Sequence, residues 1–208
     1  MSIWFSADCH FNHKNIIEYC NRPYASVKEM NKALIDNWNS VVAPEDTVWV
    51  IGDMFMGSWK NISEIVPQLN GDIYLVIGNH DSKHRQEEMA KAGIHIYEAQ
   101  IAGFHHVQEV IPMAIHNFGE IEDKSYETVR EAIRNNPVDP VDIEGKDVIW
   151  LYGHIHDNAP AGIQKEEHGV YSFHVGVDTN NYTPVSWDYI VEQYKKLKDE
   201  ECKDNHVS

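Results

Sequence analysis

The sequence predicts a layered α/β domain of the αββα type, in which helices cover stacked sheets. Short apolar runs rich in β-branched and aromatic residues recur along the chain, and each ends in polar or glycine-containing residues. Helical patterns lie between several of these runs. No repeat, low-complexity tract or Pro/Gly-rich linker divides the chain. We therefore expect one domain over residues 1–198 and a polar, frayed tail over residues 199–208.

Several elements have specific signals. The runs at 47–51 and 73–77 are apolar enough to be strands buried on both faces. Ser26 and Glu29 form a capping box that begins a helix at 26–42, and Pro184 opens a last helix that ends near residue 198. Further strands are expected at 3–7, 94–98, 106–110, 113–115, 148–152 and 170–175, and further helices at 61–69, 82–92 and 126–135.

Composition narrows the function classes. No window approaches 18 consecutive apolar residues, and the N-terminus has no basic segment or cleavage site of a signal peptide, so neither membrane insertion nor secretion is expected. A net charge of −16 argues against a general nucleic-acid coat. Cys9, Cys20 and Cys202 form neither a CxxC pair nor an even disulfide framework, which indicates a cytoplasmic protein.

Residues that bind metals follow five of the expected strands. In open α/β sheets the carboxyl ends of the strands are where ligands bind, so these side chains are expected to meet at one rim. Alternation along an extended chain would send Asp8 and His10 to the same side, and likewise His154 and His156. Glycines 52, 78 and 153 permit a positive φ or a close approach of the backbone. The candidate ligands are Asp8, His10, Asp53, Asn79, His116, His154 and His156.

This set of ligands exceeds what one tetrahedral zinc requires, and it suits two divalent ions that share a carboxylate. Mixed oxygen and nitrogen ligation without thiolate suits Mn²⁺, Fe, Zn or Ni, and affinity order does not choose among them; we expect Mn²⁺ first. Two divalent ions with two aspartates and a bridging hydroxide sum to about +1, so the centre can attract phosphate within an acidic protein.

These blocks resemble, in order, the D-x-H, G-D, G-N-H-D/E, isolated H and G-H-x-H motifs of the calcineurin-like metallophosphoesterase superfamily. The resemblance implies a four-layer αββα sandwich of two mixed sheets flanked by helices. It implies that His80 lies beside the scissile phosphate and that Asp53 bridges the two ions. By resemblance, one ion binds Asp8, His10, Asp53 and His156, and the other binds Asp53, Asn79, His116 and His154. The opening residues 8–23 are similar to a small bacterial and phage branch of the superfamily.

The chain departs from the phosphoprotein phosphatases of the superfamily at one motif. Those enzymes carry G-D-x-x-D-R-G, whereas residues 52–57 here read Gly-Asp-Met-Phe-Met-Gly, without the second aspartate that would hold the catalytic histidine. A Ser/Thr protein phosphatase is therefore disfavoured. The orientation of His80 must come from another group, and Asp81 or a backbone carbonyl are the two candidates.

Other polar residues near the motifs have two interpretations each. His13 either touches a substrate phosphate or is a surface or helix-capping residue. Arg22 and Arg85 could clamp a phosphate, but pairing with surface carboxylates is favoured. Cys9 is interpreted as a buried structural thiol.

The expected activity is hydrolysis of a phosphoester by a hydroxide that bridges the two metals, with protonated His80 donating to the leaving oxygen. A small site without an obvious cap favours a phosphodiester or a nucleotide as substrate, and no membrane or protein partner is expected. Two alternatives remain open: a nuclease acting on DNA or RNA, and a metal-binding interaction module without turnover.

Overall fold

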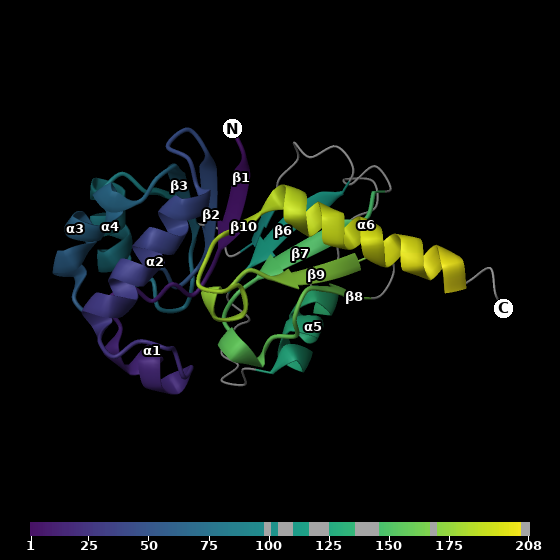
Figure 1. Cartoon of the computed structure of the whole chain (residues 1–208), viewed down its shortest axis with the longest axis horizontal. Coiled ribbons are helices and arrows are strands. Elements are labelled where there is room, and N and C mark those ends of the chain that lie inside the picture. The colour runs from purple at the N-terminus through teal and green to yellow at the C-terminus, as the bar shows by residue number, and fades with distance from the viewer. Residues whose placement is uncertain (98–100, 104–109, 117–124, 136–145, 167–169, 205–208) are drawn as a thin grey trace.

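Two five-stranded mixed sheets form the centre of the computed structural model, which describes residues 1–97, 101–103, 110–116, 125–135, 146–166 and 170–204. The first sheet has the order β10-β1-β2-β3-β4 and the second the order β5-β6-β7-β9-β8 (Figure 1). The strands of the first sheet are β1 (Ile3–Ser6), β2 (Thr47–Ile51), β3 (Asp72–Val76), β4 (His95–Tyr97) and β10 (Val185–Ser186). Those of the second are β5 (Ile101–Gly103), β6 (Ile111–Ile115), β7 (Val148–Tyr152), β8 (Ile163–Lys165) and β9 (Val170–His174).

The central strands of each sheet are parallel, which places their carboxyl ends at one rim. β1, β2, β3 and β4 pair in parallel, and so do β6, β7 and β9. β10, β5 and β8 pair antiparallel to their neighbours. Just beyond the ends of β1 and β9, Ala7 and Gly176 form a parallel bridge, and Val177 N–H donates to the Ala7 carbonyl at 3.1 Å. The two sheets therefore join where their strands end.

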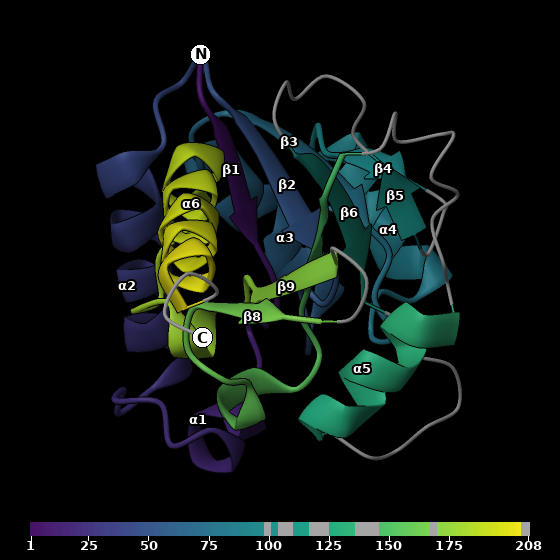
Figure 2. The same cartoon turned by 90° about the vertical axis from the view of Figure 1, so that its right-hand side faces the viewer.

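Helices cover the outer faces of the sheets, which gives the four expected layers (Figure 1). The helices are α1 (Lys14–Tyr19), α2 (Val27–Val41), α3 (Ile62–Ile65), α4 (Lys83–Lys91), α5 (Tyr126–Asn135) and α6 (Trp187–Asp204), with 3₁₀ turns η1 (Trp59–Asn61), η2 (Val66–Gln68), η3 (His156–Asn158) and η4 (Val177–Thr179). α2, α3 and α4 lie on the first sheet and α5 on the second, whereas α6 contacts β1, β10 and β8 along the side of the sandwich (Figure 2). No helix in the described ranges is long and apolar enough to cross a membrane.

The core follows from residue spacing. In α2, Met30, Leu34 and Trp38 recur every four residues and pack against the first sheet, which is the stripe that a covering helix needs. All five residues of β7 are buried, because Ile149 and its alternate neighbour face the first sheet while Trp150 and its alternates face α5. Each such side chain contributes roughly 1.5–3 kcal/mol when fully buried.

The serine half of the capping box predicted for α2 is present, and the glutamate half is shifted by one residue. Ser26 Oγ accepts from Glu29 N–H at 3.2 Å, which satisfies one N–H group that the helix start leaves without a partner. Glu29 Oε2 accepts from the backbone N–H of Ala25 at 2.9 Å, the residue before the N-cap.

Some expected elements differ in the structure. Residues 185–186 pair with β1 as β10, so the last helix begins at Trp187 and not at Pro184. That helix continues to Asp204, and the frayed tail expected from residue 199 is therefore helical as far as it is described. Short elements β5, β8 and α1 were not expected from the sequence. The strand expected at 106–110 lies outside the described residues except for Val110, which is buried.

Candidate metal centre

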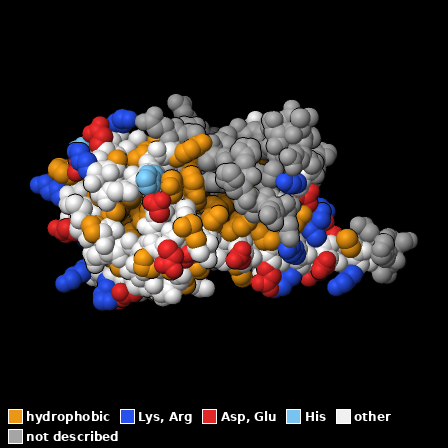
Figure 3. Space-filling view, turned by 90° about the horizontal axis from the view of Figure 1, so that it is seen from above, with side chains coloured by type: hydrophobic (Ala, Val, Ile, Leu, Met, Phe, Trp, Pro, Cys, Tyr) orange, Lys and Arg blue, Asp and Glu red, His pale blue; other side chains and the backbone are white. Residues whose placement is uncertain are grey.

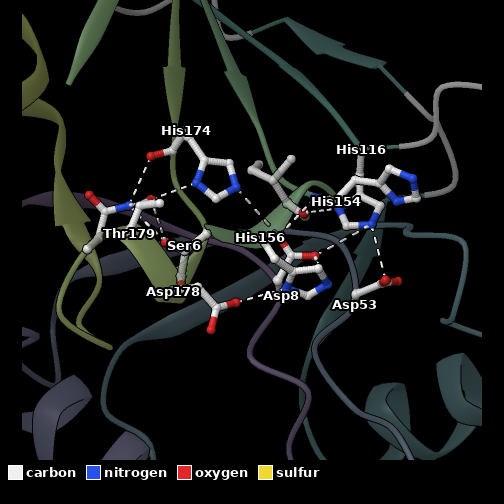
Figure 4. Close-up of polar contacts among 12 residues, drawn as sticks. Ser6, Asp8, Asp53, His116, His154, His156, His174, Asp178 and Thr179 are labelled. Carbon is white, nitrogen blue, oxygen red and sulfur yellow. Dashed lines mark hydrogen bonds and ion pairs between the residues drawn. The ribbon is translucent and has the colours of Figure 1, made fainter. Parts of the chain in front are cut away.

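The seven candidate ligands lie together at the rim where the two sheets join. They follow β1, β2 and β3 of the first sheet and β6 and β7 of the second. Figure 4 shows five of them close together: Asp8, Asp53, His116, His154 and His156. All except Asn79 are buried. Buried ionisable side chains need a partner for their charge. A metal ion is a partner that can bind both aspartate and histidine side chains.

Asp8, His10 and His156 form the first cluster. Their ligand atoms lie within 4.8 Å of one another. His156 Nε2 is 4.0 Å from Asp8 Oδ1, and His10 Nε2 is 3.8 Å from Asp53 Oδ2. Asp8 Oδ1 and both ring nitrogens of His10 are buried without a hydrogen-bond partner in the described structure. Such orphaned atoms are costly unless a bound group satisfies them, so these residues fit a cation.

A second cluster lies on the other side of Asp53. His116 Nε2 is 3.3 Å from Asp53 Oδ2 and 3.3 Å from Asn79 Oδ1, and His154 Nδ1 is 3.1 Å from the same amide oxygen. His116 Nδ1 contacts the Ile51 carbonyl at 2.6 Å, which fixes the ring and leaves Nε2 toward the carboxylate. Asp53 is therefore within reach of both clusters.

The pKa of Asp53 indicates that this carboxylate attracts positive charge, whereas burial raises the pKa of Asp8. Burial alone raises the pKa of Asp53, but His116, His10 and His80 together lower it below its usual range. Burial lowers the pKa of His116, yet Asp53 and Asp8 raise it to about 9. Burial also dominates at His10, where it keeps the pKa well below the usual value and the ring neutral. The site thus combines an ionised Asp53 carboxylate with a neutral His10 imidazole that is free to ligate.

Most of the ligands have left-handed backbone conformations, which corrects the expected extended alternation. φ is 55° at Asp8, 48° at His10, 53° at Asp53, 76° at His154 and 50° at His156. Non-glycine residues adopt such angles rarely, and the strain clusters at functional sites where the surrounding structure imposes it. The side chains converge because each strand ends in a sharp turn, not because the chain continues extended.

Hydrogen bonds between the turns hold these conformations. Asp8 N–H donates to the Gly52 carbonyl at 3.1 Å, and His10 N–H donates to the Asp53 carbonyl at 3.0 Å. His154 N–H donates to Asp8 Oδ2 at 2.8 Å, which leaves Oδ1 for another partner. The loops after β1, β2 and β7 therefore fix one another.

Gly52, Gly78 and Gly153 are needed mainly because a side chain at these positions would clash with its neighbours, and less because of unusual backbone angles. Only Gly52 has a positive φ, at 78°. A Cβ on Gly153 would lie 2.6 Å from Asp8 Oδ2. A Cβ on Gly78 would lie 2.5 Å from the backbone N of Asp53 and closer still to its Oδ1. Side chains at these positions would displace the candidate ligands.

His80 lies at the open side of the cluster. Its side chain is 36% exposed, and its Nε2 is 3.9 Å from Asp53 Oδ2. Its backbone is held at both ends, because its N–H donates to Asp53 Oδ1 at 2.8 Å and its carbonyl accepts from Arg85 at 2.6 Å. Asp81 instead accepts the N–H groups of Gly78 and Asp53. Asp81 thus holds the turn, and the position of His80 is set through its backbone.

Among the residues with two interpretations, His13 lies with its ring centroid 5.3 Å from that of His10, and it caps α1 with no side-chain hydrogen bond. Cys9 is buried, as expected of a structural thiol. Arg85 donates to two backbone carbonyls, those of His80 and Gly57, and not to a surface carboxylate. Arg22 pairs with a buried carboxylate, Asp178, where a surface one was expected.

Asp178 and His174 are residues of the site that sequence reasoning missed. Asp178 Oδ2 lies 2.8 Å from His156 Nδ1, and His174 Nε2 lies 4.0 Å from Asp8 Oδ2 (Figure 4). The Val-Gly-Val-Asp run after β9 was a signal for the first, since it follows another strand end at the same rim. His174 lies inside β9 and has no comparable signal.

Comparison with known proteins agrees with this geometry. The family model for calcineurin-like phosphoesterases matches residues 1–199. The uncharacterized protein MJ1445 of Methanocaldococcus jannaschii is 35% identical over 203 residues, which cover 94% of this chain and 93% of that protein. The Gene 66 protein of Mycobacterium phage L5 is 37% identical over 84 residues, or 39% of this chain and 40% of that protein.

A solved structure shows the same fold. The protein of unknown function AQ665 from Aquifex aeolicus matches with a TM-score of 0.65 at 24% identity, over 92% of this chain and 98% of that one. Family motifs, clustered aspartate and histidine side chains and fold therefore agree. The chain belongs to the calcineurin-like phosphoesterase family and is a metal-dependent phosphoester hydrolase.

Proposed function

We propose that this chain hydrolyses a small phosphodiester or a nucleotide phosphoester at a centre of two Mn²⁺ ions. The observation that carries the proposal is the placement of His80 beside the buried clusters. Its half-exposed ring lies 3.9 Å from Asp53, whereas the ligand side chains of the first cluster are buried. A substrate can thus reach the centre from the side on which His80 lies.

Asp53 would be the ligand common to both ions. Its Oδ2 lies 3.8 Å from His10 Nε2 and 3.3 Å from His116 Nε2, which supports this assignment. One ion would be held by Asp8, His10, Asp53 and His156, and the other by Asp53, Asn79, His116 and His154.

The chain's own residues have separate tasks. The two ions, when bound, supply a water nucleophile at neutral pH and neutralise charge on the phosphoryl oxygens. His80, as imidazolium, donates its proton to the leaving oxygen, which accelerates departure of a poor leaving group by about 10²–10⁴-fold. Asn79 ligates through an amide oxygen and so adds no negative charge on the side where the anionic substrate arrives.

Mn²⁺ suits the chemistry of this donor set. Each cluster combines imidazole nitrogens with carboxylate or amide oxygens, and neither proposed ligand set includes a thiolate. Fe, Zn and Ni accept similar donors, so metal analysis of the purified chain, followed by reconstitution with each ion, tests the choice.

A small substrate is favoured over a nucleic acid. Arg22 and Arg85 both donate to protein groups, which leaves neither as a ready phosphate contact. Figure 3 shows the end of the molecule where β1 begins, and on that face lysine and arginine side chains are interspersed with aspartate and glutamate. A nuclease needs clustered positive charge, and the net charge of −16 opposes it.

The cysteines support a cytoplasmic location for this enzyme. Cys9, Cys20 and Cys202 are all free thiols, and the first two are buried. Free thiols are the usual state in a reducing compartment.

The test is a substrate panel with Mn²⁺ and a matched chelated sample. It contains aryl phosphomonoesters and phosphodiesters, cyclic and linear nucleotides, and single-stranded DNA and RNA. We expect turnover of a small diester or nucleotide, loss of that turnover with chelator, and recovery when Mn²⁺ is restored. Full activity in the chelated sample contradicts the metal mechanism, preference for the polymers identifies a nuclease, and no turnover of any substrate by metal-loaded protein favours an interaction module.

A further inference from the structure

A buried ion pair between Arg22 and Asp178 lies next to the candidate metal centre. Arg22 Nε donates to Asp178 Oδ1 at 2.7 Å and Nη2 donates to Oδ2 at 3.0 Å, so the pairing is bidentate. The two side chains are 0% and 1% exposed. Burying both charges removes them from water, and such a pair is often no more stabilising than apolar side chains of the same volume. Stability alone therefore gives little reason for the pair.

The carboxylate of this pair contacts a candidate ligand. Asp178 Oδ2 lies 2.8 Å from Nδ1 of His156. Both oxygens of Asp178 accept from the Arg22 guanidinium, a fork of donors that matches an ionised carboxylate. An ionised carboxylate can only accept, so His156 Nδ1 carries the hydrogen. The other ring nitrogen, Nε2, then lies on the side of Asp8 Oδ1, at 4.0 Å.

The guanidinium also fixes the backbone of the loop after β1. Arg22 Nη1 donates to the Cys9 carbonyl at 2.9 Å, and Nη2 donates to the Asp8 carbonyl at 2.8 Å. Asp8 and His10 have positive φ angles on either side of these carbonyls. One side chain therefore holds the strained segment that presents two ligands and, through Asp178, the ring of a third.

We propose that Asp178 and Arg22 are positioning residues for the metal ion bound by Asp8, His10 and His156. Asp178 holds the His156 imidazole with Nδ1–H toward the core and Nε2 toward the metal, and Arg22 fixes Asp178 and the Asp8 backbone together. The inference rests on the metal centre of the proposed function. Removing such an outer partner of a ligating histidine lowers metal affinity by about 10–100-fold.

Mn²⁺ titration of purified protein without substrate tests this, with affinity and stoichiometry followed by equilibrium dialysis and the Mn²⁺ pair followed by electron paramagnetic resonance. We expect Asp178→Asn to bind one ion about 10–100-fold more weakly and to lose the signal of a coupled pair at limiting metal. Arg22→Met/Asp178→Asn removes both charges, so it avoids an unpaired buried cation and gives the same readout if the single variant does not fold.

Asp147→Asn is the matched control. Its carboxylate also accepts from a cation and a second donor, Lys198 at 2.8 Å and Tyr194 at 2.7 Å, but it precedes strand β7 at the end opposite the candidate ligands. We expect it to bind both ions with wild-type affinity.

Each outcome decides one point. The positioning role is overturned if a folded Asp178 variant binds both ions with wild-type affinity. It is also overturned if the Asp147→Asn control loses as much Mn²⁺ affinity as the Asp178 variant. A wild-type chain that binds no Mn²⁺ overturns the proposed metal centre, and this inference with it.

Discussion

Replacing Gly78 with alanine is expected to disable the metal centre by steric displacement of Asp53. The added Cβ would lie 2.5 Å from the Asp53 backbone N and closer to Oδ1 of the same residue, whereas real Cβ atoms essentially never approach other heavy atoms so closely. The carboxylate or the turn after β3 must therefore move. Overpacking of this kind destabilises a folded protein by about 1–3 kcal/mol.

The displacement has a second effect, because Asp53 Oδ1 also accepts from His80 N–H at 2.8 Å. Moving the carboxylate breaks that hydrogen bond and changes the distances from Oδ2 to both clusters. Metal binding stabilises a folded protein by about 2.7 kcal/mol when the ion is present at about 100 times its Kd. We therefore expect Mn²⁺ to raise the melting temperature of the wild-type chain and to have little effect on Gly78→Ala.

Gly162→Ala is the control for glycine replacement as such. Gly162 has a φ of 70°, and a Cβ added there would have no described atom within 4 Å, so alanine meets backbone strain without a clash. That strain is about 1–2 kcal/mol. Both variants lose stability by similar amounts in denaturant unfolding, but only Gly78→Ala is expected to lose bound metal. Two ions per chain in Gly78→Ala, with the wild-type thermal shift, refute the reasoning.

Three further outcomes are expected. Asp53→Asn loses more bound metal than Asn79→Ala, because the carboxylate lies between both clusters and the amide in one; metal analysis that finds two ions per chain in Asp53→Asn contradicts this. His80→Ala retains both metals while kcat falls by about two to four orders of magnitude on a poor leaving group and much less on an activated aryl one. Kinetics that show equal losses on both substrates rule out proton donation. The Cys9 thiol, whose pKa burial raises to about 12, resists alkylation at neutral pH, whereas the exposed Cys202 reacts; rapid labelling of Cys9 in folded protein, read by mass spectrometry, disproves it.

The strands that carry the site could be predicted because a strand buried on both faces has apolar residues at consecutive positions. A strand covered on both faces, such as Val148–Tyr152, is apolar at every position. Polar residues directly after such a run mark its end at the rim. This is why the positions of Asp53 and His116 along their strands followed from the sequence, together with the layered fold.

Short elements at the edges were not predictable in the same way. β10 has two residues and depends on pairing of Phe5 with Val185 and of Trp4 with Ser186, which are contacts distant in sequence. Helix α1 has six residues, no acidic residue in its first turn and no side-chain cap. Local propensity is too weak in such segments, so tertiary contacts decide their conformation.

The backbone of the site was also beyond a pattern argument. Alternation along an extended chain and a left-handed turn both bring Asp8 and His10 toward one centre, so the correct convergence followed from an incorrect conformation. The partnership of Arg22 with Asp178 joins residues 156 positions apart and has no local signal. The left-handed turn and the Arg22–Asp178 pair are both stabilised by hydrogen bonds between loops that are distant in sequence. These hydrogen bonds form only in the folded chain, so no local pattern predicts them.

The charge balance of the buried site leads to one more expected outcome, which is that metal binding releases protons. Burial lowers the pKa of His116, but Asp53 and Asp8 raise it to about 9. Burial likewise opposes charge on His156, but Asp8 and Asp178 raise its pKa to about 10. Below these values both imidazoles carry protons that offset the buried carboxylates when no cation is present.

A divalent ion needs unprotonated ring nitrogens, so it competes with these protons. Because both pKa values are raised, the competition is strong at neutral pH, and metal affinity rises with pH until the two histidines have lost their protons near pH 9 and 10. Calorimetric titration with Mn²⁺ in buffers of different ionisation enthalpy counts the protons released. An affinity that does not change between about pH 6 and 8, with no proton release, would show that both rings are already neutral. It would contradict the raised pKa values of the two histidines.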